Sequence, residues 1–217
     1  TVPNAQPIRA IGPGGELYLA HNGNVVNAEP LRRELLDIGV QFEGTTDSEV
    51  IAYLIVHAPG DTWGDRIASA MRRLEGAYSL TIITQDAVYA ARDPHGFRPL
   101  SFGRLDEGWI VASETCALEN VGAEFERDVE PGEILRIDAD GVSSTIARTA
   151  RRTFCVFEYI YFSRPDSHLS GERVYLTREG MGAHLARQHP VEVDLVTAIP
   201  DSAIAAGIGY AREAEMP

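Results

Sequence analysis

The sequence predicts a layered α+β fold for residues 1–150 and the opening of an α/β domain over residues 151–217. In the first part, two or three amphipathic helices lie between two sets of strand-like segments, without the regular strand–helix–strand alternation of a parallel sheet. After residue 152 the chain becomes dense in aromatic side chains. Near its end, an apolar strand, a tight turn and a helix of small residues follow one another, as they do where a doubly wound sheet begins.

Composition and charge exclude several classes of protein. The chain has 217 residues, of which 44% are hydrophobic and 24% charged, as in soluble globular proteins with a sizeable core. Its net charge of -13 argues against nucleic acid or an anionic membrane as the main partner. No run approaches the ~18 apolar residues of a membrane span, and no signal peptide is recognisable. Cys116 and Cys155 form no CxxC motif, so we expect free thiols in a reducing cytoplasm.

The first part contains three expected helices and most of the strands. Residues 1–13 predict a loop, and because a domain rarely begins in a loop that leads straight into a strand, we expect a piece of a longer protein. Helical spacing of apolar residues predicts helices over 27–38, 46–58 and about 61–74. Alternation and turn signals predict a short helix over 116–119 and strands over 15–19, 40–42, 76–84, 87–91, 100–104, 109–113, within 129–137 and over 141–146.

The second part contains fewer, more apolar elements. Residues 154–162 predict a buried strand or a packed segment between domains, and residues 174–188 predict a helix. A strand over 193–199 is followed by the turn Pro200-Asp201-Ser202 and a helix of small residues over 203–215. Because ligands bind at the carboxyl ends of strands in a doubly wound sheet, this turn is either a ligand site or a helix cap.

The first candidate site is the dipeptide Asn22-Gly23, where the expected strand over 15–19 gives way to a loop. Asparagine supplies a side-chain amide donor, and glycine lets a ligand approach its backbone N–H closely. Two donors from adjacent residues, directed at one point, are what an oxyanion hole requires. The alternative, which the dipeptide by itself favours, is the tight turn of a β-hairpin.

The second candidate is Asp47, in the first turn of the helix expected over 46–58. Thr46 and Glu49 have the spacing of a capping box, so Asp47 either compensates the helix dipole or holds the ammonium group of a ligand. The six histidines show no metal-ligand spacing. The roles of His21, beside Asn22, and of His95, between two arginines, stay open.

Taken together, several segments resemble the glutaminase domain of class II glutamine amidotransferases. They are Asn4-Ala5-Gln6-Pro7, Ala20-His21-Asn22-Gly23-Asn24, Thr45-Thr46-Asp47-Ser48-Glu49, Gly76-Ala77-Tyr78-Ser79, and the stretches over 92–100 and 112–118. Two later segments, 157–167 and 200–202, narrow the resemblance to the amidophosphoribosyltransferase family. The resemblance covers essentially all 217 residues, and the ordered set of motifs is specific although each motif alone is weak.

The resemblance implies a fold and a reaction. Residues 1–150 would form a class II glutaminase domain, an αββα sandwich of the N-terminal-nucleophile hydrolases whose first strands are missing. Residues 151–217 would begin an incomplete type I phosphoribosyltransferase domain. The family takes ammonia from glutamine and uses it to displace pyrophosphate from phosphoribosyl pyrophosphate (PRPP), which gives 5-phosphoribosylamine in the first step of purine synthesis. The resemblance also implies a homo-oligomer that purine nucleotides inhibit.

The resemblance assigns roles to five residues. Asn22 and Gly23 would form the oxyanion hole, and Asp47 would hold the α-ammonium group of glutamine. Ser202 would help to bind PRPP and Mg²⁺. Some members carry a [4Fe-4S] cluster, and Cys155 matches one of its four ligands, whereas other members keep a cysteine here without a cluster.

The sequence also departs from the family. It begins with Thr1, so the N-terminal cysteine nucleophile is absent, as is the arginine that binds the glutamine carboxylate. We therefore expect the 217 residues alone to be inactive. Two alternatives remain: a glutaminase that serves another acceptor, such as a sugar phosphate or an aspartyl adenylate, and a glutamine-binding or scaffold protein without a nucleophile.

Overall fold

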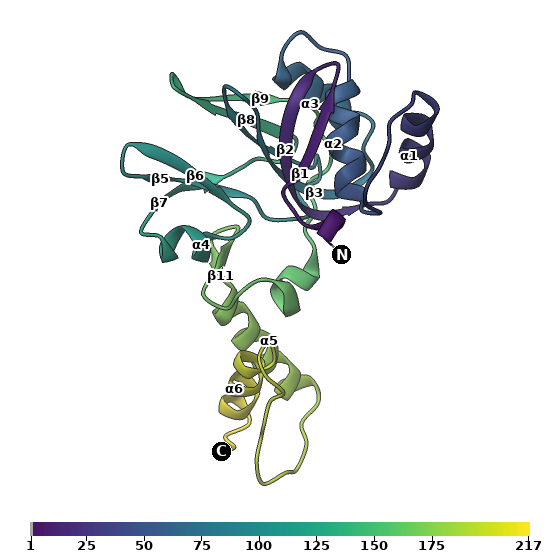
Figure 1. Ribbon diagram of the computed structural model, residues 1–217. Coiled ribbons are helices and arrows are strands. Elements are labelled where there is room, and N and C mark those ends of the chain that lie inside the picture. Colours follow the sequence, from purple (N-terminus) through teal and green to yellow (C-terminus); the bar gives the residue numbers. More distant parts are fainter. Residues whose placement is uncertain (1) are drawn as a thin grey trace. The chain divides into compact units, whose positions relative to one another are not determined.

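The computed structural model describes residues 2–217, which divide into two compact units (Figure 1). The first unit runs to Ser113 and resumes over Glu126–Phe154. The second consists of Glu114–Phe125 and Cys155–Pro217. The expectation that rests on Thr1, the missing nucleophile, lies outside the described residues. The first unit therefore ends at Phe154, and the short segment after Ser113 groups with the second unit.

Two antiparallel sheets form the framework of the first unit. The larger has six strands in the order β1-β2-β3-β4-β8-β9, and the smaller has the order β6-β5-β7. The strands of the larger sheet are β1 (Ile8–Gly12), β2 (Gly15–Val25), β3 (Gly76–Ile83), β4 (Val88–Arg92), β8 (Glu133–Asp138) and β9 (Gly141–Ile146). Those of the smaller sheet are β5 (Ser101–Leu105), β6 (Gly108–Ala112) and β7 (Glu124–Asp128).

The central strands of the larger sheet, β4 and β8, are buried on both faces, which produces three layers. Neighbouring residues on a strand point to opposite faces. Ala91 and Ile134 belong to the core cluster shared with α1 (Ala28–Asp37), α2 (Asp47–His57) and α3 (Trp63–Met71). Their neighbours Ala90 and Leu135 belong to a second cluster that includes Leu100, Phe102 and Val129. Helices thus cover one face and the smaller sheet covers the other.

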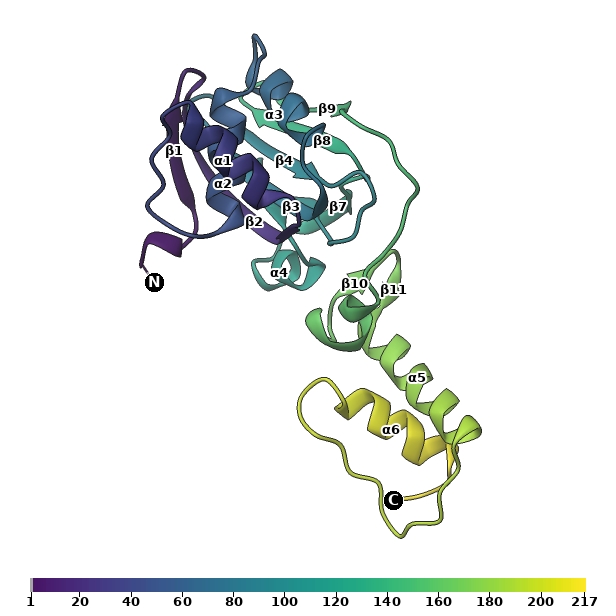
Figure 2. The same ribbon diagram turned by 90° about the vertical axis from the view of Figure 1, so that its right-hand side faces the viewer.

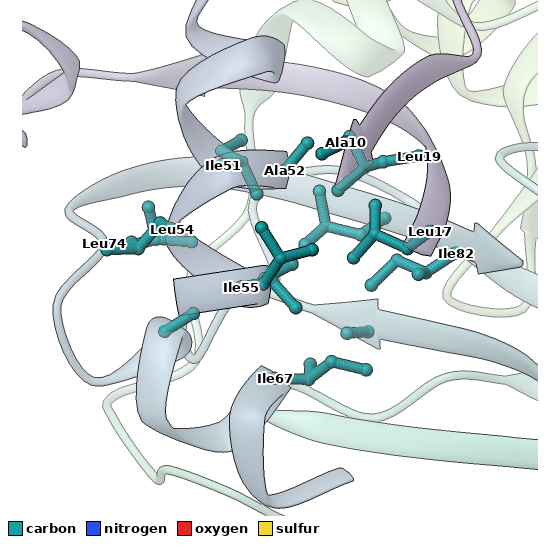
Figure 3. Packing of buried hydrophobic residues seen from close by; sticks show 14 of the residues in the cluster. Ala10, Leu17, Leu19, Ile51, Ala52, Leu54, Ile55, Ile67, Leu74 and Ile82 are labelled. Carbon is teal, nitrogen blue, oxygen red and sulfur yellow. The ribbon is translucent and has the colours of Figure 1, made fainter. Parts of the chain in front are cut away.

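The core on the helical face is built around α2. The apolar stripe expected on this helix is confirmed, because Ile51, Leu54 and Ile55 are all buried. Figure 3 shows Ile55 close to Leu17 and Leu54 beside Leu74; Leu17 and Leu19 alternate along β2 and are fully buried. Burying a side chain of this size stabilises the fold by about 1.5–3 kcal/mol, so this contact holds α2 on the sheet.

Two of the predicted helix starts have different hydrogen bonds from those expected. The Thr46 side chain accepts a hydrogen bond from the Glu49 N–H at 3.3 Å and caps α2. The Glu49 carboxylate, however, accepts from the N–H groups of Glu43 and Gly44 instead of closing a capping box. Asn27 occupies the N-cap position of α1, but its side chain bonds to the loop before β3. The two helix starts were therefore predicted correctly, and the capping box of α2 only in part.

Two strand predictions in the first unit were wrong, and one strand was missed. β2 continues to Val25 instead of ending near residue 19, because β3 pairs with it as far as Val25↔Gly76. Residues 40–42 form no strand, although Val40 is buried in the core. β7 was not predicted, since its charged sequence lacks the apolar alternation that marks a half-buried strand.

The aromatic segment of the second unit is helical and exposed, which contradicts the expected buried strand. Residues 158–162 form one turn of π-helix, η2 (Glu158–Phe162). Phe157 is 56% exposed and Tyr161 65% exposed. The buried Arg178 donates hydrogen bonds to the carbonyl oxygens of Tyr159 and Ser163, so a guanidinium group organises this turn. Aromatic content predicted burial, whereas polar bonds to the backbone decide the conformation.

The rest of the second unit is a small hairpin and a pair of helices. The hairpin joins β10 (His168–Leu169) and β11 (Glu172–Arg173), and α4 (Thr115–Asn120) belongs to the same unit. The helices α5 (Val174–Gln188) and α6 (Ile204–Glu213) pack side by side (Figure 2). In the described part of the chain, none of the helices combines the length and apolar character needed to cross a membrane.

The segment expected to form a strand over 193–199 has no regular secondary structure. Leu195 is 64% exposed and Ile199 83% exposed. No described strand pairs with this segment, and a strand needs a neighbour to satisfy its backbone groups. The turn at Pro200-Asp201-Ser202 and the following helix are present as predicted.

Candidate active site

Asn22 and Gly23 lie within β2 and not in a loop or hairpin turn. Asn22 is opposite Ser79 of β3, and Ser79 is opposite Arg92 of β4. Because Arg92 lies two residues from Ala90, this row of side chains is on the face that carries the smaller sheet. The Asn22 amide donates a hydrogen bond to the Ser113 hydroxyl at 3.2 Å, just after β6 ends. The amide donor is therefore held between the two sheets.

Gly23 occupies a position that no other residue fits. Its φ is +156°, and a Cβ atom there would overlap the carbonyl oxygen of Ala77 on β3. The same Cβ would also lie 2.8 Å from Nε2 of His21. Glycine at this position thus reflects a close approach of two backbones inside the sheet, and the alternative of a hairpin turn was wrong.

Asp47 is attached to the end of β2 although it begins α2. Its Oδ2 accepts a hydrogen bond from the Val25 N–H at 2.9 Å, and its Oδ1 lies 3.8 Å from Nδ1 of His21. The Asp47 side chain is 24% exposed, so the carboxylate is anchored and still reachable from solvent. The fold thus ties the helix that carries the carboxylate to the strand that carries Asn22 and Gly23.

His21 lies beneath this arrangement on the helical face. Its side chain is 1% exposed, and its Nδ1 lies 3.1 Å from the hydroxyl oxygen of Ser48. Burial lowers the pKa of His21, while the nearby Asp47 carboxylate and the Ala77 carbonyl act in the opposite direction. Since burial is the largest of these effects, the imidazole is neutral near pH 7.

The stretch over 92–100 is a structural loop built on two buried charges. The Arg92 guanidinium donates to the carbonyl oxygens of Gly96, Arg98 and Val129, and burial lowers its pKa. The Asp93 carboxylate accepts from the N–H groups of His95, Gly96 and Phe97, and burial raises its pKa. Nδ1 of His95 lies 3.0 Å from the Arg151 carbonyl oxygen. These contacts assign His95 to the scaffold of the first unit.

Ser202 and Cys155 lie in the second unit. Ser202 lines a small, mainly apolar pocket with Ile160 and Met181, and Ala203 rather than Ser202 is the N-cap of α6. The helix-cap interpretation of this serine was therefore wrong. Cys155 is a half-buried free thiol. Ser202 offers one hydroxyl group and Cys155 one thiol. Among the described residues, no group of three or more His, Cys, Asp and Glu side chains is placed to hold a metal ion.

Sequence reasoning missed two residues that contact the candidate site. Ser113 is the partner of the Asn22 amide, and Gln6 bonds to the backbone of His21. Both lie in segments that carried the family resemblance, and that membership was the only signal available. A long-range partner cannot be inferred from spacing along the chain, because the fold brings the two positions together.

Comparison with known proteins agrees with this geometry. A model of the glutamine amidotransferase domain matches residues 2–120, which is more than half of the chain. The chain belongs to the glutamine amidotransferase family. The matched region contains Asn22, Gly23 and Asp47, and ends within α4.

Curated relatives extend the likeness to the whole chain. An amidophosphoribosyltransferase of Mycobacterium tuberculosis is 46% identical over 224 residues, which cover 100% of this chain and 42% of the relative. The enzyme of the same name from Archaeoglobus fulgidus is 46% identical, and the match covers 48% of its length. The one from Bacillus subtilis is 45% identical, and the match covers 43% of its length. The chain thus spans about half the length of the curated relatives it matches.

Solved structures confirm the predicted fold class for this amidotransferase chain. The glutamine PRPP amidotransferase of B. subtilis, complexed with ADP and GMP, superimposes with a TM-score of 0.93 at 44% identity, covering 99% of this chain and 48% of that one. A structure described as the allosteric regulatory enzyme of purine biosynthesis gives the same TM-score of 0.93 and covers 99% of this chain and 46% of that one.

Proposed function

We propose that the chain is part of an amidophosphoribosyltransferase, in which ammonia from glutamine displaces pyrophosphate from PRPP and yields 5-phosphoribosylamine, the first step of purine synthesis. The observation that carries this proposal is a likeness to enzymes of that name over both units, at 44% identity and 99% coverage of this chain for the B. subtilis structure. A glutaminase domain serving another acceptor would share the first unit alone.

In this proposal, β2 stabilises the intermediate of glutamine hydrolysis. Attack on the glutamine amide places negative charge on its oxygen, and the Asn22 side-chain amide and the Gly23 N–H are the donors for that charge. Ser113 holds the Asn22 amide at 3.2 Å before substrate arrives, so little reorganisation is needed. In this proposal the attacking group is the thiol of an N-terminal cysteine of the full-length protein, and Cys116 and Cys155 take no part in the attack.

Asp47 then serves as the anchor for the glutamine ammonium group. Its Oδ2 is already engaged by the Val25 N–H, which fixes the orientation of the carboxylate. Its second oxygen faces the neutral imidazole of His21 at 3.8 Å, so the charge of Asp47 is not cancelled by a cation there. A partly exposed, oriented carboxylate is suited to bind an ammonium group by a charge-assisted hydrogen bond.

The second unit would contribute to the phosphoribosyl acceptor site. We assign Ser202 to the binding of PRPP with Mg²⁺, which would neutralise phosphate charge, and Cys155 to a [4Fe-4S] cluster in the form of the enzyme that carries one. Each residue supplies one donor, so both sites need further ligands. Purine nucleotide inhibition, a homo-oligomeric state and a cytoplasmic location belong to the same proposal; the free thiols support the last of these.

An assay of a full-length protein carrying this sequence tests the proposal. Pyrophosphate release should require PRPP and Mg²⁺, together with either glutamine or ammonia as nitrogen donor. Glutamine hydrolysis coupled to amination of a sugar phosphate or an aspartyl adenylate, without pyrophosphate release from PRPP, would contradict it. Glutamine binding without hydrolysis would instead support the scaffold alternative.

A further inference from the structure

The segment Asn4–Pro7, which precedes β1, contacts both elements that carry the candidate active site. The Asn4 amide donates to the Thr45 hydroxyl at 3.2 Å, and its carbonyl oxygen accepts from the Thr45 N–H at 3.0 Å. Gln6 reaches β2 instead, where its amide oxygen accepts from the His21 N–H at 2.5 Å and its amide nitrogen donates to the His21 carbonyl at 3.0 Å. The segment therefore joins β2 to the loop before α2.

The Gln6 side chain replaces a missing strand neighbour. β1 pairs with β2 only as far as Ile8↔Leu19, so within the described residues no strand pairs with His21 on that side of β2. An amide group that both accepts from and donates to one residue reproduces the exchange of two hydrogen bonds in an antiparallel pair. Gln6 thus extends the ladder by one position, immediately before Asn22 and Gly23.

The same amide also reaches α2. The Gln6 nitrogen lies 3.5 Å from the hydroxyl oxygen of Ser48, the residue that follows Asp47 and contacts His21 at 3.1 Å. One side chain therefore contacts the oxyanion strand and the helix start that bears the carboxylate. Gln6 is exposed, so these bonds do little for the hydrophobic core, and they hold two elements in relative position.

We propose that Gln6 is a positioning residue for glutamine hydrolysis, which fixes the backbone of His21 and thereby the two oxyanion donors that follow it. This inference rests on the proposed function. It assigns Gln6 no contact with substrate. Because small displacements of oxyanion donors are costly, loss of the Gln6 bonds should lower the kcat for glutamine and leave the phosphoribosyl acceptor site unaffected.

The variant Gln6→Ala in a full-length enzyme tests this. The ratio of glutamine-dependent to ammonia-dependent phosphoribosylamine formation should fall about tenfold, mainly through kcat, because ammonia bypasses the hydrolysis step. Gln85→Ala is the matched control, since Gln85 is an exposed glutamine in the turn between β3 and β4 of the same unit, and its ratio should stay at the wild-type value.

The variant Gln6→Glu adds a readout that a loss of stability would not reproduce. At neutral pH the introduced glutamate is ionised, so it keeps an acceptor for the His21 N–H, loses the donor and directs negative charge at the His21 carbonyl. The glutamine-to-ammonia ratio of Gln6→Glu should therefore fall at least as far as that of Gln6→Ala, again through kcat and not through the KM for glutamine. The ammonia-dependent rate, which a general loss of stability would lower, should stay at the wild-type value in both variants.

The outcomes separate this inference from the function on which it rests. A wild-type enzyme without PRPP-dependent activity would overturn the proposed function and this inference with it. An active wild type whose Gln6→Ala variant matches Gln85→Ala, or whose Gln6→Glu variant keeps the wild-type glutamine-to-ammonia ratio, would overturn the role of Gln6 alone.

Discussion

The two units of the chain bury their apolar residues to very different extents. In the first unit most apolar side chains of α2, β2 and β3 are buried, among them Ile51, Leu19 and Leu80. In the second unit Phe157, Leu195 and Ile199 are each more than half exposed, although they are as hydrophobic. The difference teaches that a hydrophobic pattern predicts a buried helix or strand reliably only where other described residues pack against its apolar side chains.

The candidate site residues follow the same division. Asn22, Gly23 and Asp47 are held by hydrogen bonds or by a close backbone approach within the first unit. Ser202 lines a mainly apolar pocket of the second unit, and Cys155 is a half-buried thiol there. We therefore regard the proposed glutamine site as preorganised by this chain. The following variants of a full-length enzyme test the difference between the two units.

The largest effect is expected for Asn22→Ala in the first unit. Removing one oxyanion donor should slow glutamine hydrolysis about 100-fold or more, while ammonia-dependent synthesis survives. Steady-state rates with each nitrogen donor measure both activities. If both fell equally, Asn22 would have a structural role and the first unit would not contain a separate glutamine site.

The second unit is tested through the contact between its two long helices. A Cβ at Gly182 of α5 would overlap the carbonyl oxygen of Ala206 on α6, whereas a Cβ at Gly180 meets no atom within 4 Å. Gly182→Ala should cost about 2 kcal/mol of unfolding free energy, and Gly180→Ala should be neutral or stabilise by up to ~1 kcal/mol.

Hydrogen exchange of the same two variants sharpens the comparison. Gly182→Ala should accelerate exchange in α5 and α6 and leave β2 and β3 unchanged, because the two pairs of elements belong to different units. Acceleration that spreads equally to β2 would show that the units unfold together, and an effect of Gly180→Ala as large as that of Gly182→Ala would reject the close helix contact.

A smaller effect is expected for Asp47→Ala. Loss of a charge-assisted bond to the glutamine ammonium group should raise the KM for glutamine about tenfold, equivalent to ~1.4 kcal/mol of binding free energy. The rate with saturating ammonia serves as the internal reference. An unchanged KM for glutamine would reject the ammonium-binding role and leave Asp47 as a link between α2 and β2.

Local signals predicted helices better than strands in this chain. The helix α2 was found because its apolar spacing and its capping residue are encoded within a few residues of one another. The strand β7 was missed, and the strand expected over 193–199 is not present, because pairing depends on a neighbour elsewhere in the chain. Gly23 is the clearest case: its sequence suggests a turn, while the carbonyl oxygen of Ala77 is the reason for its lack of a side chain.

The sequence by itself determined the α+β class, the family resemblance and the candidate residues Asn22, Gly23 and Asp47, because composition, helical periodicity and short motifs are properties of neighbouring residues. Only the tertiary structure decided that Asn22 meets Ser113, that Asp47 binds the end of β2, and that Gln6 bonds to His21. These contacts join residues 15 to 91 positions apart, and the chain brings them together only when burial of the core offsets the entropy of closing those loops.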